Sequence, residues 1–186
     1  MSEKVCVITG GTSGIGKATA EAMRRRGYTV YELSRRETGL AGFCHIPTDV
    51  TKPEMVEAAV AEILRQETHI DVLINNAGLA LGLDKEYEGD PTDWNTMIDT
   101  NIKGLLTMTR LVVPGMVARN RGHVINIGSV AGDAAYACGN VYCATKAAVK
   151  ALTDGLRIDV AHTEVRVTNV KPGLVETNFS RVRFHG

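Results

Sequence analysis

The sequence predicts an α/β protein built on a doubly wound parallel sheet with helices on both faces. Short apolar runs bounded by turns alternate with helical patterns along the chain, and a parallel sheet with helical crossovers requires this order of elements. A glycine-rich turn joins the first apolar run to the first helical pattern, as in nucleotide-binding folds of this class. With 186 residues, the chain is long enough for one domain with a sizeable core.

Six strands are expected where the apolar runs lie between turns. Their ranges are 4–9, 28–33, 43–47, 71–75, 122–127 and 165–170. Helices are expected at 14–26, from a cap at Thr51 to about Glu67, at 92–119 and at 140–161. The connection at 35–42 contains two glycines and leaves little room for a helix.

The helix ends are predicted from capping residues. Gly27 ends the first helix. Thr51 is expected to cap the second, with Pro53 in its first turn and Glu54 completing a capping box. The pair Asp90-Pro91 is expected to cap the third helix. Pro114 is expected to bend that helix, since it removes one hydrogen-bond donor from the ladder.

The composition is that of an ordinary globular chain, with 44% hydrophobic and 23% charged residues. The 21 basic residues balance the 21 acidic ones, so no global field favours nucleic acid or an anionic membrane. The start lacks a signal-peptide pattern, and no run approaches transmembrane length. The four cysteines form no C-x-x-C pair and the five histidines show no metal-ligand spacing. We therefore expect a cytoplasmic protein with free thiols and no metal.

The glycine-rich turn is a candidate pyrophosphate site. Its glycines are spaced G-x-x-x-G-x-G, which permits a tight turn and a close approach of the backbone to an anion at the helix N-terminus. A plain glycine-rich turn is the alternative, but the strand–turn–helix setting favours nucleotide binding. The expected contacts are Gly10, Thr12, Ser13, Gly14, Ile15 and Gly16.

The end of the second strand predicts which dinucleotide is bound. Proteins that bind NAD place an acidic residue there for the ribose hydroxyls, whereas this chain has Ser34 followed by Arg35 and Arg36. A guanidinium can pair with a 2′-phosphate through two hydrogen bonds. The alternative is that one or both arginines are merely solvated. The sequence favours NADP.

Ser129, Tyr142 and Lys146 form a candidate acid/base site. Tyr142 and Lys146 are four residues apart, so a helix places them on one face. A neighbouring cation lowers the pKa of a phenol from its reference value of about 10, and the Ser129 hydroxyl could hold the same substrate oxygen. Such a site can interconvert an alcohol and a carbonyl. Tyr and Lys at this spacing are also common on solvated helices, so the rest of the chain must decide.

The chain resembles the short-chain dehydrogenase/reductase family over its whole length. The matching motifs are T-G-G-T-S-G-I-G at 9–16, Asp49-Val50, N-N-A-G at 75–78, Asn101 in N-I-K-G, Ser129, Tyr142-x-x-x-Lys146, and Pro172-Gly173 with Thr177. The resemblance implies a three-layer Rossmann-type fold with strand order 3-2-1-4-5-6.

The resemblance also implies a role for each matching residue. Tyr142 is then the catalytic acid/base, Ser129 positions the substrate oxygen, Lys146 lowers the pKa of the phenol and holds the nicotinamide ribose, and Asn101 holds a water of a proton relay. Asp49 would contact the adenine amino group, and Thr177 the nicotinamide carboxamide. The remaining expected cofactor contacts are Val50, Asn75, Ala77, Gly78, Pro172, Gly173 and Val175.

Several runs from Asn75 onward resemble one subgroup, the NADP-dependent 3-hydroxy acid (serine/allo-threonine) dehydrogenases. They include N-N-A-G-L-A-L-G, D-W-N-T-M-I-D-T-N and P-G-L-V-E-T-N-F-S-R-V-R-F. Arg181 and Arg183 are candidates for binding a substrate carboxylate. The alternatives are a 3-oxoacyl, steroid or sugar carbonyl as substrate, a non-catalytic NADP-binding regulator, and a truncated partner subunit.

Two departures from the family pattern are expected. The helix that usually follows the second strand is missing, and the chain stops at Gly186, before the usual substrate loop, helix and last strand. We therefore expect a single domain, 1–186, truncated at that point, with an exposed sheet edge. By the same resemblance, the helix from Thr92 and the helix that carries Tyr142 would pack between subunits of a homodimer or homotetramer.

Overall fold

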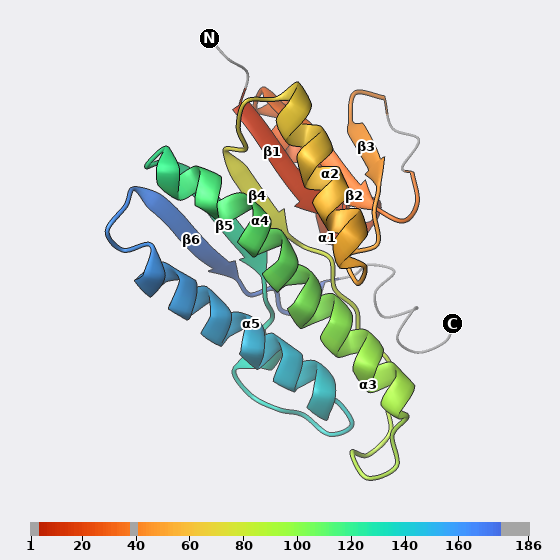
Figure 1. Cartoon of the computed structure of the whole chain (residues 1–186). Coiled ribbons are helices and arrows are strands. Elements are labelled where there is room, and N and C mark those ends of the chain that lie inside the picture. The colour runs from red at the N-terminus through yellow and green to blue at the C-terminus, as the bar shows by residue number, and fades with distance from the viewer. Residues whose placement is uncertain (1–3, 38–40, 176–186) are drawn as a thin grey trace.

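The computed structural model describes residues 4–37 and 41–175, and it contains the predicted sheet (Figure 1). Six parallel strands lie in the order β3-β2-β1-β4-β5-β6, which confirms the predicted fold class and strand order. The strands are β1 Lys4–Thr9, β2 Tyr28–Ser34, β3 Cys44–Pro47, β4 Val72–Asn75, β5 Gly122–Ile127 and β6 Val165–Val170. The helices are α1 Gly14–Arg25, α2 Pro53–Gln66, α3 Pro91–Ile98, α4 Leu105–Ala118 and α5 Asn140–Asp159.

Two apolar layers hold the helices against the two faces of the sheet. On one face, Ile63 of α2 and Met108 of α4 belong to the same buried cluster as Leu73 of β4, and α5 lies beside α4 on this face (Figure 1). On the opposite face, Ala20 of α1 packs in a second cluster with Ile8 of β1. Each fully buried aliphatic side chain contributes about 2 kcal/mol by its removal from water.

The parallel sheet brings the carboxyl ends of all its strands to one edge. The loops that follow all six strands therefore meet there, although they are far apart in the sequence. The strand order reverses between β1 and β4, and open α/β sheets bind ligands in the crevice at such a point. The fold thus predicts where the functional site lies.

The prediction of a single helix at 92–119 is wrong in one respect. The structure has α3 and α4 joined by a π-helical segment, Asp99–Gly104. A π-helical turn accommodates one extra residue through wider hydrogen bonds, and it leaves no mark in the apolar pattern. Pro114, at which the sequence predicts a bend, lies inside α4. The π-helical segment lies ten residues or more before it.

The caps were predicted with mixed success. The Asp90 carboxylate accepts a hydrogen bond of 2.7 Å from the Thr92 amide, so it caps α3 as expected. The capping box at Thr51 is wrong: the N-cap of α2 is Lys52. The Thr51 hydroxyl instead donates to Oδ1 of Asp49 at 2.8 Å. The other element ends agree with the prediction within two residues, which is the usual uncertainty.

The connection between β2 and β3 is short, and its described residues, 35–37 and 41–43, are not helical. This agrees with the expectation that little room exists for a helix there.

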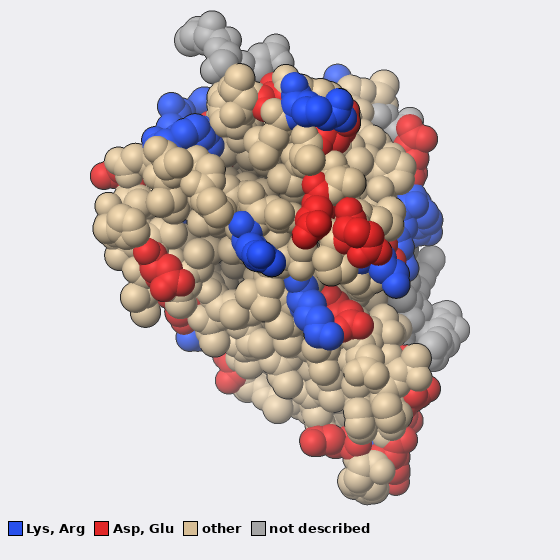
Figure 2. Space-filling model, in the orientation of Figure 1, with Lys and Arg blue, Asp and Glu red and all other residues tan. Residues whose placement is uncertain are grey.

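Over the described part of the chain, no helix combines the length and apolarity needed to cross a bilayer. On the face drawn in Figure 2, basic and acidic side chains are interspersed.

Candidate active site

A glycine-rich loop leaves β1 and enters α1 at the carboxyl edge of the sheet. Gly10 and Gly14 have φ values of +67° and +52°, in the left-handed region where residues with side chains are strained. A Cβ on Gly16 would lie 2.3 Å from both the Gly10 carbonyl oxygen and Nδ2 of Asn76. Ser13 is the N-cap of α1, and its side chain makes no cap hydrogen bond. Backbone amides and the positive end of the helix dipole are therefore available to an anion.

Gly16→Ala is expected to raise the dissociation constant for NADPH at least tenfold, because the loop must shift to admit the new methyl group. Gly115→Ala is the matched control. A Cβ on Gly115, in α4, would meet no atom within 4 Å, so this change should stabilise the protein by about 0.5–1 kcal/mol and leave binding unchanged. Fluorescence titration with NADPH measures both, and equal dissociation constants in the two variants would contradict this account of the loop.

A cleft of about 950 Å³ runs along the carboxyl edge of the sheet, within the size range of ligand pockets. It unites predicted residues from the loops that follow all six strands with two residues of α5. Those that line it are Gly10, Thr12, Ser13, Gly14, Ile15, Gly16, Ser34, Arg35, Arg36, Asp49, Val50, Ala77, Gly78, Ser129, Tyr142, Lys146, Pro172, Gly173 and Val175. The cradle of glycine backbone at one end and the arginines beside it fit a phosphorylated dinucleotide.

Asp49 lies beside the arginine end of this cleft. Burial by itself would raise the pKa of its carboxyl group, but hydrogen bonds from the amide and hydroxyl of Thr51, with the positive charges of Arg35 and Lys52, hold that pKa below its usual value. Asp49 is therefore an ionised hydrogen-bond acceptor at neutral pH. Such an acceptor suits an exocyclic amino group, the contact that the sequence predicts.

Ser129, Tyr142 and Lys146 line the same cleft. Ser129 follows β5, and its Oγ accepts a hydrogen bond of 3.1 Å from the Ala131 amide. Tyr142 and Lys146 lie one turn apart on α5, with the Lys146 Nζ 5.8 Å from the centre of the Tyr142 ring. The helix geometry therefore brings a phenol and an ammonium together, and the serine hydroxyl lines the same cleft.

Lys146 is a buried cation, with 6% of its surface exposed. Its Nζ donates to the Ile127 carbonyl oxygen at 2.9 Å, and burial lowers its pKa to about 8. At neutral pH it is therefore still mostly protonated. A positive charge in this position favours the phenolate form of Tyr142.

Asn101 lies behind the cleft in the π-helical segment. Its Nδ2 donates to the Leu79 carbonyl at 2.8 Å and to Oγ1 of Thr145 at 3.0 Å, and its Oδ1 accepts from the Leu79 amide at 2.9 Å. A Cβ on Gly78 would lie 3.3 Å from Oδ1 of Asn101 and 3.4 Å from Nζ of Lys146. The two side chains thus approach each other across Gly78, and the water relay predicted for them stays a prediction.

The model of the family described as "short chain dehydrogenase" matches residues 4–185. The chain belongs to the short chain dehydrogenase family. It is 47% identical over 191 residues to the NADP-dependent 3-hydroxy acid dehydrogenase YdfG of Salmonella typhi, and the match covers 98% of this chain and 77% of that protein.

Solved structures of serine dehydrogenases are similar to this dehydrogenase throughout its fold. The closed form of a serine dehydrogenase complexed with NADP⁺ is 45% identical, with a TM-score of 0.92, over 98% of this chain and 77% of that one. The serine dehydrogenase of Escherichia coli is 43% identical, with a TM-score of 0.88, over 92% of this chain and 83% of that one.

Some residues predicted for this dehydrogenase lie elsewhere. Asn75 does not line the cleft, because its Nδ2 donates to Oδ1 of Asn126 at 2.9 Å inside the sheet. The next residue, Asn76, lines the cleft and donates to the Thr9 and Gly10 carbonyls. A cofactor contact through the side chain of Asn75 therefore has no support from its position. Outside the described residues lie Thr177, Arg181 and Arg183.

The sequence did not predict a cofactor contact for several other residues of the cleft. They include Leu33, Thr48, Thr51, Asn76, Leu79, Ala80, Thr96, Asp99, Thr100, Ile127 and Gly128. Most of them are neighbours of predicted residues in the same loops. They could have been predicted, because they follow the ends of strands. The exceptions come from α3 and the π-helical segment, whose approach to the cleft depends on tertiary packing.

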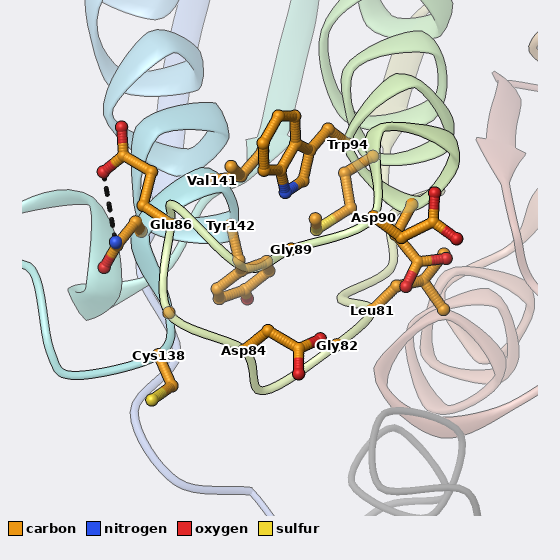
Figure 3. A pocket seen from close by; sticks show the side chains of 14 residues that line it. Leu81, Gly82, Asp84, Glu86, Gly89, Asp90, Trp94, Cys138, Val141 and Tyr142 are labelled. Carbon is orange, nitrogen blue, oxygen red and sulfur yellow. Dashed lines mark hydrogen bonds between the residues drawn. The ribbon is translucent and has the colours of Figure 1, made fainter.

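A small hollow of about 30 Å³ adjoins Tyr142, which lines both cavities. Trp94 and Val141 contribute apolar surface, and Asn140 donates to Oε2 of Glu86 at 3.1 Å (Figure 3). Four carboxylates, Asp84, Glu86, Asp90 and Asp93, and no cationic side chain, belong to its described lining. Among the described residues, no three side chains are grouped as a metal site would need. A substrate carboxylate is therefore not expected to point into this hollow.

Proposed function

We propose that this dehydrogenase is an NADP-dependent oxidoreductase that interconverts the hydroxyl group of 3-hydroxy acids, serine among them, with the corresponding carbonyl. The observation that carries the proposal is that Ser129, Tyr142 and Lys146 line the same cleft as the glycine-rich loop and Arg35. The likeness to the 3-hydroxy acid and serine dehydrogenases supports the substrate class and NADP.

The residues of the chain orient the substrate, transfer the proton and stabilise the charge. NADP, when bound, supplies the hydride acceptor or donor. Tyr142 takes the hydroxyl proton during oxidation and returns it during reduction, while the Ser129 hydroxyl holds the substrate oxygen. Lys146 stabilises the phenolate charge from the same helix. The protein therefore contributes orientation, a proton path and electrostatics, and the hydride chemistry belongs to the cofactor.

A homo-oligomer in the cytoplasm is the assembly and location that we propose. Leu106 of α4 is 43% exposed and Ile158 of α5 is 76% exposed, which supports a subunit contact on these helices. Cys6, Cys44 and Cys143 are free thiols, and burial raises the pKa of the Cys6 thiol to about 12. An unreactive buried thiol and unpaired cysteines suit a reducing compartment.

The test is the absorbance of NADPH at its reduced-nicotinamide band, with NADP and a panel of substrates. Turnover with L-serine, allo-threonine or 3-hydroxyisobutyrate is expected, with NAD giving a lower kcat/KM than NADP. Turnover limited to a 3-oxoacyl thioester, a steroid ketone or a sugar would move the substrate assignment to that class. NADPH binding without any turnover would instead favour a regulator, and turnover only after addition of a second chain would favour a partner subunit.

A further inference from the structure

Glu32 is a carboxylate buried inside the sheet, with only 1% of its surface exposed. Three donors surround it. Its Oε1 accepts a hydrogen bond of 2.8 Å from the Gly11 amide. Its Oε2 lies 2.7 Å from Nδ1 of His45 and 3.1 Å from Oγ of Ser34. Acceptance from several donors is what a buried ionised carboxylate needs.

These three partners belong to separate segments of the cofactor site. Gly11 lies in the glycine-rich loop, and Ser34 ends β2 and lines the cleft beside Arg35. His45 lies on the edge strand β3, directly opposite Glu32 in the strand register. Glu32 itself does not line the cleft. One buried side chain therefore connects the loop expected to bind the pyrophosphate with the residues expected to bind the 2′-phosphate.

The charge of Glu32 is unfavourable for such a site unless it is compensated. A carboxylate next to Ser34 repels a phosphate bound there, and the repulsion is stronger inside a protein than in water. Ser34 cannot shield it fully, because its single hydroxyl proton is shared between Glu32 and the Arg36 carbonyl, 2.7 Å away. His45, with 13% of its side chain exposed, is the side chain that the structure places 2.7 Å from Oε2 of Glu32, and it forms an ion pair with Glu32 when its ring is protonated.

We propose that Glu32 and His45 are a positioning pair for NADP, in which His45 supplies the positive charge that keeps Glu32 from repelling the 2′-phosphate at Ser34 and Arg35. Glu32 holds the glycine-rich loop against the end of β2. Protonated His45 makes the buried pair neutral. The pair therefore sets the preference for NADP over NAD without touching either cofactor.

The test compares the dissociation constants of NADPH and NADH, measured by fluorescence titration, in a double-mutant cycle. His45→Gln retains a hydrogen-bond donor but cannot carry a charge, so it should weaken NADPH binding by about tenfold while NADH binding changes much less. Glu32→Gln removes the charge that needs compensation. Combined with His45→Gln, it should therefore restore the affinity for NADPH. His69→Gln, which alters a histidine paired with Asp71 at 3.2 Å, is the control and should change neither constant.

A purely structural role for the pair gives a different pattern. Equal weakening of NADPH and NADH by His45→Gln, no weakening of either, or failure of Glu32→Gln to restore NADPH binding would each overturn the proposal. Circular dichroism melts confirm that each variant is folded, and His45→Asn replaces His45→Gln if that variant is not. The inference rests on the NADP dependence proposed above. Failure of the unmodified protein to bind NADPH would count against that dependence and not against the pair.

Discussion

Tyr142→Phe is expected to lower kcat by a factor of about 10² to 10⁴, the contribution typical of a positioned acid/base group. The phenol lies at the cleft with the buried Lys146 ammonium 5.8 Å from its ring centre, so its hydroxyl is the group that can exchange a proton with the substrate. Phenylalanine keeps the ring and its packing. The dissociation constant for NADPH should therefore change by less than about threefold.

The control for this substitution is Tyr28→Phe. Tyr28 begins β2, at the end of the sheet opposite the cleft, and its ring lies against Lys4, with Nζ 5.8 Å from the ring centre. Removal of that hydroxyl should leave kcat unchanged. Steady-state rates with L-serine and NADP, together with NADPH titrations, measure both variants. If Tyr142→Phe kept more than a tenth of the rate, the proton would have to pass through another group.

Lys146→Met is expected to abolish turnover and yet to stabilise the protein at pH 7. Burial lowers the pKa of Lys146 from 10.5 to about 8, which corresponds to a cost of about 3 kcal/mol for keeping the charged form buried. Methionine fills similar space without a charge. Loss of the hydrogen bond to the Ile127 carbonyl offsets about 1 kcal/mol, so Tm should rise by about 5 °C.

The pH dependence of this difference follows from the lowered pKa. Below pH 8 both the folded and the unfolded chain hold the Lys146 proton, so the full cost is present. Between about pH 8 and 10.5 the folded chain releases the proton while the unfolded chain keeps it, and the cost disappears. The advantage of Lys146→Met should therefore shrink as the pH rises through this window.

Thermal melts of the cofactor-free protein measure the effect, because bound NADP would itself add stability. Lys150→Met, one turn further along α5, is the control. Lys150 is an exposed residue paired with Asp154 at 2.9 Å, and its removal should change Tm little. A lower Tm for Lys146→Met at pH 7 would mean that its hydrogen bond outweighs the burial of its charge.

The residues that could be predicted from sequence are those whose relationship is local. Tyr142 and Lys146 share a helix face because of their spacing, and Asp90 caps α3 because it directly precedes it. The Thr51 cap was wrong because Asp49, two residues earlier, competes for the Thr51 amide and hydroxyl. Capping rules that use local sequence alone do not decide between two such neighbouring side chains.

Non-local features could not be predicted. The pairing of Glu32 with His45 depends on the register between β2 and β3, which the sequence does not state. Asn101 reaches Leu79 because a π-helical segment adds a residue between α3 and α4, and the apolar pattern does not reveal it. Asn75 and Asn76 are adjacent, and only the twist of the chain after β4 decides which one reaches the cleft.

The close approach of Gly11 to Glu32 limits how this protein can change over evolutionary time. A Cβ on Gly11 would lie 2.6 Å from Cγ of Glu32. The space between these two positions can therefore hold a side chain from only one of them. A side chain can be gained at position 11 only after the one at position 32 has become smaller. Substitutions at the two sites, which are 21 positions apart in sequence, therefore depend on each other, and the order in which they occur matters.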